Sequence, residues 1–438
     1  MLKLNTTCFA LLALFFSTVA EARPNEIIFL TLVDAMRPDH LGAYGYDKPT
    51  SPNMDALAKA GKRYTRIYVN APWTRPSIAS FLTGQNASRH ATQTAKSKLP
   101  KKVKTLAQHL KASGWMTAGF VANGNGGSLA GLEKGFDVFR DPTNTYTKKV
   151  RGKTYNGLPT GEFLIARTLE WLEGVKADKL FVFLFLVDPH DPYYAPPELE
   201  KKFLGNHKGK IRRRALWEYD NDYSLAERQS MLAIYDAGIA YADLAIGQLF
   251  TGLKRLGLYD KSTFLISADH GEGFGEHGFY LHAHHFWEEV IKVPLIVAGP
   301  KIKPGVDDRL ADSLDVVATI ADIAGAPFKT IPGVSLLGAK EKNPRVISEY
   351  NEFGIRRQAI IGPRYKVIWQ RPADEAWFNR YVKDRKYFPS VSFDKDVIQV
   401  FDIKEDPLEQ KDLSPKMPKA AKELLEELKN FVFAKDAS

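Results

Sequence analysis

The stretch IIFLTLVD, residues 27–34, decides the fold. Its continuous apolar run is too short for a typical helix and has no polar face, which is typical of a strand buried on both sides in a parallel sheet. Asp34 follows the run directly and so stands at the carboxyl end of the strand, where open α/β sheets bind their ligands. The stretch therefore predicts a parallel sheet with a functional site at one edge.

The same pattern occurs twice more along the chain. LFVFLFLV (180–187) runs into Asp188-Pro-His190, and STFLISA (262–268) ends at Asp269-His270. Helical periodicity lies between these runs, at 51–58, 103–113 and 225–256, and VPLIVAG (293–299) is a further buried strand. Interior strands that alternate with helices predict a doubly wound, mostly parallel α/β sheet flanked by helices.

The pattern changes after residue 345. RRQAIIGPRYKVIWQ (356–370) and VIQVFDI (397–403) alternate over short spans with turn residues between them, and MPKAAKELLEELKNFVF (417–433) is amphipathic at helical spacing. We therefore predict a catalytic α/β domain over 23–345 and a C-terminal α+β subdomain over 346–438, with a small antiparallel sheet plus a helix.

The first 22 residues have the pattern of a cleaved signal peptide, with a short apolar run and a small-residue cleavage site. Cys8 is the only cysteine and lies in this segment, so the mature chain can use neither disulfides nor thiolate ligands. No second apolar run is long enough to span a bilayer. The sequence predicts a periplasmic or secreted protein without a transmembrane anchor.

The net charge of +10 has two interpretations: exposed basic loops that keep the protein in solution, or a surface that gathers an anionic ester substrate such as an envelope polymer or glycan. No nucleic-acid-binding motif accompanies this charge, so we expect no nucleic acid partner. The sequence leaves the oligomeric state open.

Eight segments resemble, in order, the signature segments of the sulfatase-like branch of the alkaline phosphatase superfamily. The resemblance covers nearly the whole mature chain and implies an alkaline phosphatase-like fold and an ester hydrolase that acts on phosphoric or sulfuric esters. The segments are LVDAMRPDHLGAYGY (32–46), SPNMDALAKAG (51–61), APWTRPSIASFLTG (71–84), VDPHDPYY (187–194), SADHGEGFGEHG (267–278), VPLIVAGP (293–300), LDVVATIADIAGAP (314–327) and FDIKEDPLEQKDL (401–413).

Two departures from the sulfatase pattern concern the nucleophile and the sulfate-binding residues. Sulfatases convert a cysteine or serine to formylglycine at the start of C/S-x-P-x-R, whereas this chain has Thr74 there and Ile78 in place of the arginine. Oxidation of a threonine hydroxyl gives a ketone, so formylglycine chemistry should be unavailable. The family's Gly-Lys-x-His segment is replaced by FVANGNGG (120–127), which lacks both Lys and His.

Threonine at this position resembles the phosphoryl-transferring relatives: nucleotide pyrophosphatase/phosphodiesterases, lipoteichoic acid synthases and phosphoethanolamine transferases. The resemblance implies that the Thr74 hydroxyl attacks phosphorus and forms a covalent intermediate, assisted by a divalent metal. It places that metal on Asp34, Thr74, Asp269 and His270. An imidazole and few oxygen ligands favour zinc or manganese, with calcium as the weaker alternative.

The resemblance also assigns parts to other side chains. His190 and His282 correspond to residues that hold a second metal or contact the leaving group, and His284 competes with His282 because the H-x-H spacing lets either ring face the site. From their own chemistry, Arg75 is a candidate anion clamp or a surface ion-pair partner, and Asn123 is a candidate donor to the transferred oxygen or a plain turn residue. We expect the remaining members of this segment to be structural, namely Glu272, His277 and His285.

These inferences predict a secreted, metal-dependent hydrolase that cleaves phosphate or phosphonate esters through a Thr nucleophile. Two alternatives stay open: a sulfuric ester hydrolase that works without formylglycine, and a catalytically silent binding protein that kept only the fold. Metal content and the response to substitution at Asp269 or His270 distinguish the silent protein from the enzymes.

Overall fold

The computed structural model describes residues 23–142, 154–155, 158–211, 223–340, 344–382 and 390–436, so the predicted signal peptide lies outside the described residues. Its core is an eight-stranded sheet with the order β12-β2-β11-β8-β1-β7-β3-β4. The central strand β1 is buried from its second residue onward and pairs in parallel with both neighbours. The strands are β1 (Glu26–Val33), β2 (Lys62–Tyr68), β3 (Met116–Val121), β4 (Val138–Arg140), β7 (Lys179–Leu186), β8 (Ser262–Ala268), β11 (Lys292–Ala298) and β12 (Gly305–Asp312).

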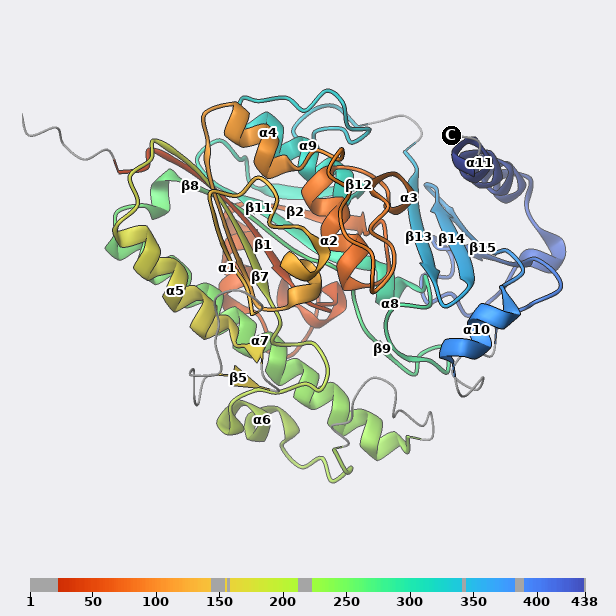
Figure 1. Cartoon of the computed structure of the whole chain (residues 1–438). Coiled ribbons are helices and arrows are strands. Elements are labelled where there is room, and N and C mark those ends of the chain that lie inside the picture. Colours follow the sequence, from red (N-terminus) through yellow and green to blue (C-terminus); the bar gives the residue numbers. More distant parts are fainter. Residues whose placement is uncertain are drawn as a thin grey trace, which may run out of the picture.

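Helices cover both faces of this sheet, as predicted (Figure 1). One face is covered by α1 (Pro52–Ala60), α5 (Gly161–Glu173) and α7 (Leu225–Arg255), and the other by α2 (Thr74–Thr83), α4 (Leu106–Ala112) and α9 (Ser313–Ile323). Only β11 runs antiparallel to its neighbours in the part of the sheet that the structure describes. The burial of both faces explains why β1 and β7 are almost continuously apolar.

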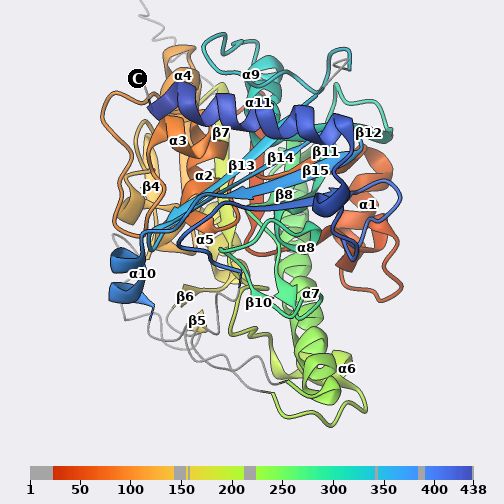
Figure 2. The same ribbon diagram turned by 90° about the vertical axis from the view of Figure 1, so that its right-hand side faces the viewer.

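A second, four-stranded antiparallel sheet follows, in the order β13-β14-β15-β16. Its strands are β13 (Val346–Glu352), β14 (Ile355–Ile361), β15 (Tyr365–Gln370) and β16 (Val397–Asp402). The C-terminal helix α11 (Lys419–Asp436) lies across one face of this sheet (Figure 2), where Leu424, Leu425 and Leu428 pack on Trp369. The C-terminal sheet plus helix is therefore confirmed.

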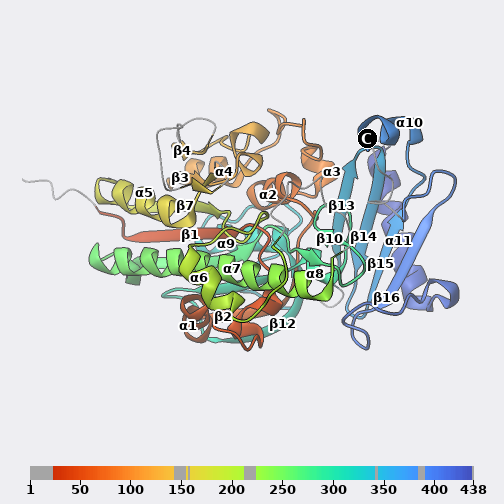
Figure 3. The same cartoon turned by 90° about the horizontal axis from the view of Figure 1, so that it is seen from below.

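The C-terminal sheet stands at the end of the main sheet toward which β1 runs (Figure 3). Val346, Tyr350 and Ile355 belong to the same continuous apolar core as β1, so the sheet is packed onto the α/β part. The boundary at residue 345 stays a prediction. The remaining elements are α3 (Ala87–His90), α6 (Pro197–Leu204), α8 (Glu288–Ile291), α10 (Glu375–Tyr381), β5 (Thr154–Tyr155), β6 (Leu158–Pro159), β9 (Gly273–Phe274) and β10 (Tyr280–Leu281).

Candidate active site

Two adjacent parallel strands bring three potential metal ligands together. Asp34 follows β1, and Asp269 and His270 follow β8, which is paired in register with β1. Each of these residues is fully buried and offers a ligand atom within 4.8 Å of the others. His270 Nε2 lies 3.5 Å from Asp34 Oδ1 and 3.3 Å from Asp269 Oδ2. The strand ends therefore form a compact cluster at the carboxyl edge of the sheet.

The chemistry of this cluster fits a divalent cation. Asp34 Oδ1 and Asp269 Oδ2 are buried and have no hydrogen-bond partner in the described part of the chain. Burial and the nearby Asp34 carboxylate raise the pKa of Asp269 well above its usual value, and burial together with His282 lowers the pKa of His270. A cation would neutralise the carboxylates and use the neutral imidazole as a ligand.

Thr74 approaches the cluster from the first turn of α2, one of the helices that cover the sheet. It is the first residue of α2, is 3% exposed, and its Oγ1 lies 3.3 Å from His270 Nε2. Ser77 Oγ donates to the carbonyl oxygen of Asp269 (2.5 Å), which ties the first turn of α2 to the end of β8. The amino end of α2 therefore adds a favourable potential for an anion beside the Thr74 hydroxyl.

Asn123 reaches the cluster from the loop after β3. Its Nδ2 donates to Asp34 Oδ2 at 3.1 Å, so in this structure its amide contacts a carboxylate in the cluster. A Cβ on Gly126 in the same loop would lie 2.8 Å from the Phe185 ring and 3.3 Å from Ile78 Cγ1. The Gly-rich loop thus packs directly on the buried Ile78, at the position where sulfatases have their motif arginine.

The Arg75 guanidinium is held by neutral oxygens. Its Nη1 donates to the carbonyl oxygens of Thr94, Ala95 and Ser97, and its Nη2 donates to Asn125 Oδ1 at 2.8 Å. Burial lowers the pKa of Arg75. Its proposed part as an anion clamp stays a prediction.

His282 and His190 continue the cluster outward. The His282 ring stacks on His270 with centroids 4.2 Å apart, and the His190 ring lies 5.1 Å from His282. Burial opposes protonation of His190, but the carboxylates of Asp34, Asp191 and Glu272 raise its pKa to about 9. The three rings therefore form a row that leads from His270 through His282 to His190.

The third strand end contributes His190 but not Asp188. Both carboxylate oxygens of Asp188 accept from the backbone N–H of Gly161, the first residue of α5. Burial raises the pKa of Asp188 to about 7. Asp188 therefore serves the start of a helix, which the strand-end pattern alone does not reveal.

The structure distinguishes between the histidines of the 280–286 segment. His284 Nδ1 lies 3.0 Å from the Tyr350 hydroxyl, and His285 Nδ1 lies 3.2 Å from Arg357 Nη1, so both face the C-terminal sheet. His282 is the one that stacks on the cluster. His277 pairs with Glu289 at 2.8 Å, in agreement with a supporting part.

Glu272 is a residue whose contact the sequence did not indicate. We expected it to be structural, but its Oε1 lies 3.1 Å from His282 Nδ1, and the side chain is fully buried. Burial raises its pKa to about 8. Its position two residues after His270 could have indicated this contact, because it puts Glu272 in the same segment that leaves the end of β8.

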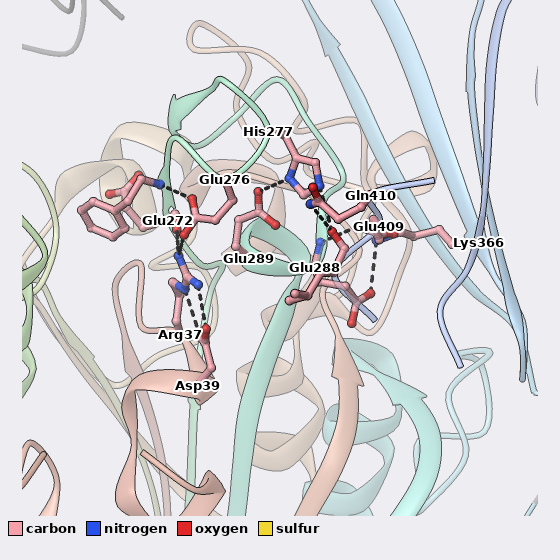
Figure 4. Close-up of polar contacts among 12 residues, drawn as sticks. Arg37, Asp39, Glu272, Glu276, His277, Glu288, Glu289, Lys366, Glu409 and Gln410 are labelled. Atoms are coloured by element: carbon pink, nitrogen blue, oxygen red, sulfur yellow. Dashed lines mark hydrogen bonds and ion pairs between the residues drawn. The ribbon is translucent and has the colours of Figure 1, made fainter. Parts of the chain in front are cut away.

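The segment that carries these histidines has further polar support (Figure 4). Arg37 pairs with Asp39 and Glu276 and donates to the Glu272 carbonyl oxygen at 3.0 Å. Beyond His277, a buried ion cluster joins the segment to the C-terminal sheet: Lys366 on β15 contacts Glu288 on α8 at 3.1 Å and Glu409 at 2.5 Å.

Comparison with known proteins places this site in a family. The Sulfatase family model matches residues 26–326. The choline-sulfatase of Rhizobium meliloti (strain 1021) is 28% identical over 388 residues, which span 76% of this chain and 75% of that protein.

Two solved structures share the fold. One was determined in complex with D-glucosamine-2-N,6-O-disulfate and matches with a TM-score of 0.75, 19% identity and coverage of 95% of this chain and 99% of the other. The phosphonate monoester hydrolase of Agrobacterium radiobacter matches with a TM-score of 0.70, 19% identity and coverage of 95% and 96%.

Among the described helices, none is both long and apolar enough to cross a membrane. Members of the matched family are metal-dependent, and the Asp34, Asp269 and His270 group offers the corresponding ligands here. The chain therefore belongs to the sulfatase family of the alkaline phosphatase-like superfamily and is an ester hydrolase of that family.

Proposed function

We propose that this protein hydrolyses phosphate or phosphonate esters, with Thr74 as the nucleophile and a divalent metal held by Asp34, Thr74, Asp269 and His270. The observation that carries the proposal is the position of Thr74 Oγ1, 3.3 Å from His270 Nε2 and at the amino end of α2. The metal, when bound, lowers the pKa of the hydroxyl and neutralises the approaching anion.

The chain's own residues supply the remaining steps. The Thr74 hydroxyl loses its proton to solvent and its oxygen attacks phosphorus, the bond from phosphorus to the ester oxygen breaks, and His190 gives a proton to the departing oxygen. Water then gives a proton to His190 and attacks the phosphorus, the bond from phosphorus to the Thr74 oxygen breaks, and the product leaves. His282, stacked on His270, lies beside His190, and the alternative to an acid role for His190 is that these two histidines hold a second metal, in which case water would protonate the departing oxygen.

Several features favour phosphorus over sulfur at the reacting centre. Threonine cannot give formylglycine, Ile78 stands in place of the motif arginine, and the Gly-rich loop contains no lysine or histidine. A sulfuric ester hydrolase that works without formylglycine is the second candidate, favoured by the 28% identity with a choline-sulfatase.

We propose zinc or manganese as the metal, and an anionic glycan or envelope polymer as the natural ester. A solved neighbour carries a sulfated glucosamine as its substrate, and the net charge of +10 suits such a polyanion. A periplasmic or secreted location agrees with the signal-like first 22 residues.

The function is tested with Thr74→Ala and the matched control Thr83→Ala, because Thr83 is buried at the other end of α2 and its hydroxyl donates to the Ala79 carbonyl oxygen of the same helix. We expect hydrolysis of 4-nitrophenyl phosphate, bis(4-nitrophenyl) phosphate or 4-nitrophenyl phenylphosphonate to fall at least about 10³-fold in Thr74→Ala and to persist in the control.

Peptide mass spectrometry of acid-quenched enzyme should find phosphate on Thr74. Turnover of 4-nitrophenyl sulfate that survives in Thr74→Ala would instead support the second candidate and overturn the nucleophile. A purified protein with no bound metal and no turnover of any of the four esters would indicate the silent binding protein.

A further inference from the structure

His282 is held between two strained residues. Leu281 and Ala283, directly before and after it, have φ angles of 70° and 90°. Residues other than glycine rarely adopt φ angles in this range. Such conformations persist where several surrounding contacts hold them. The orientation of His282 toward His270 therefore depends on the contacts that fix the segment 280–286.

Contacts from the α/β part hold one side of this segment. Leu281 pairs with Gly273 in the small β9–β10 sheet, and the Ala283 N–H donates to the Pro72 carbonyl oxygen at 2.9 Å. Pro72 lies two residues before Thr74, so the same hydrogen bond joins the histidine segment to the approach to the proposed nucleophile.

Contacts from the C-terminal sheet hold the other side. Arg357 on β14 donates through Nη1 to the His284 carbonyl oxygen at 2.6 Å and contacts His285 Nδ1 at 3.2 Å. Tyr350 on β13 places its hydroxyl 3.0 Å from His284 Nδ1. Two neighbouring strands of the C-terminal sheet thus fix the two residues after Ala283.

The burial of Arg357 is not explained by a gain in stability. It is 5% exposed, and its hydrogen-bond partners in the described part of the chain are neutral: the His284 carbonyl, the His285 ring, Gln370 Oε1 and Ser390 Oγ. Burial lowers its pKa to about 10. A buried cation without a carboxylate partner is expensive, which favours a functional reason for its presence.

We propose that Arg357 is a positioning residue, which acts across the junction with the C-terminal sheet to hold His282 against the metal cluster. Its Nε, Nη1 and Nη2 are all engaged by protein groups, so it supports the segment rather than binding a substrate anion itself. The proposal deepens the proposed function and rests on it for the part that His282 plays in hydrolysis.

The test compares Arg357→Met with the matched control Arg356→Met. Arg356 is the preceding residue of β14 and is exposed on the opposite face. Hydrogen–deuterium exchange of the full mature chain, measured by mass spectrometry, needs no substrate. We expect amides of residues 280–286 to exchange about tenfold faster in Arg357→Met and to stay unchanged in Arg356→Met.

A second variant covers the case in which Arg357→Met does not fold. Tyr350→Phe removes only the hydroxyl beside His284 Nδ1, and we expect the same segment to exchange faster in it. If residues 280–286 keep their protection in the folded variants, the proposal is overturned.

Kinetics then connect the segment to the reaction. On whichever 4-nitrophenyl ester the enzyme turns over, Arg357→Met should lower kcat about 10- to 100-fold with little change in KM, and Arg357→Lys should recover part of the loss. Faster exchange with unchanged kcat would show that Arg357 holds the segment but that His282 is not needed for hydrolysis. A wild-type enzyme without turnover would count against the proposed function and leave the exchange result to decide the positioning.

Discussion

At the scale of single residues, the Asn123 amide contacts one carboxylate of the candidate metal site. Asn123 Nδ2 donates to Asp34 Oδ2, while Asn125, two residues on, contacts Arg75 instead. We expect Asn123→Ala to weaken zinc and manganese binding about 10- to 100-fold, because a ligand that loses its orienting partner binds less well. Titration calorimetry of the metal-free protein measures this, with Asn125→Ala as the control. Equal affinities in the two variants would contradict the assignment.

At the scale of elements, α7 is joined to the loop after β1 by a buried carboxylate. Asp236 on α7 is fully buried and accepts from the Tyr46 hydroxyl (2.7 Å) and Lys48 Nζ (2.8 Å), and its Oδ1 lies 2.7 Å from His40 Nδ1. Burial opposes ionisation, but the hydrogen bonds with His40, Lys48 and Tyr46 lower the pKa of Asp236 below its usual value.

A carboxylate with a depressed folded pKa stabilises the protein above the pKa of the unfolded chain, and this stability is lost as pH falls through the folded value. Asp236→Asn should therefore lower the free energy of unfolding by about 3–5 kcal/mol at pH 7, and by progressively less as pH falls below the unfolded value of about 3.9 toward the lower folded value. Urea unfolding at pH 7 and at a series of values from about 4 down to about 2 measures the difference, with the exposed Asp260→Asn as control. A loss of the same size at both pH values would contradict the role of the charge.

At the scale of the whole molecule, a buried lysine joins the two sheets. Lys366 on β15 is fully buried between Glu288 and Glu409, whereas Lys292 contacts the same Glu288 with a side chain that is 30% exposed. Lys366→Met leaves two buried carboxylates without their shared cation and should lower the free energy of unfolding by about 3–5 kcal/mol. Lys292→Met should cost less than about 1 kcal/mol. Similar unfolding midpoints in urea for both variants would show that Lys366 does not hold the sheets together.

Much of this arrangement follows from local rules that a sequence displays. Continuous apolar runs predicted the buried parallel strands, because only a strand covered on both faces needs no polar side. The helix expected at 225–256 is found as α7 at Leu225–Arg255. Asp34 and Asp269 could each be placed at the carboxyl end of a strand, where open α/β sheets bind ligands. Their place on one metal came from the resemblance to the family, and the structure shows that the two strands are neighbours.

Other features depend on contacts between residues far apart in the sequence. Asp188 follows a strand, as Asp34 does, but its carboxylate accepts a hydrogen bond from the backbone N–H of Gly161 at the start of α5. The H-x-H spacing allowed His282 or His284 to face the cluster, and Tyr350 and Arg357, on strands that follow more than sixty residues later, hold His284 at the C-terminal sheet. The sequence by itself determined the strands and the candidate ligands that follow them, because buried strands show as apolar runs and the polar residues stand directly after those runs. Only the tertiary structure decided which loop side chains reach the site. The backbone around His282 has positive φ angles that contacts with the distant C-terminal sheet help to hold.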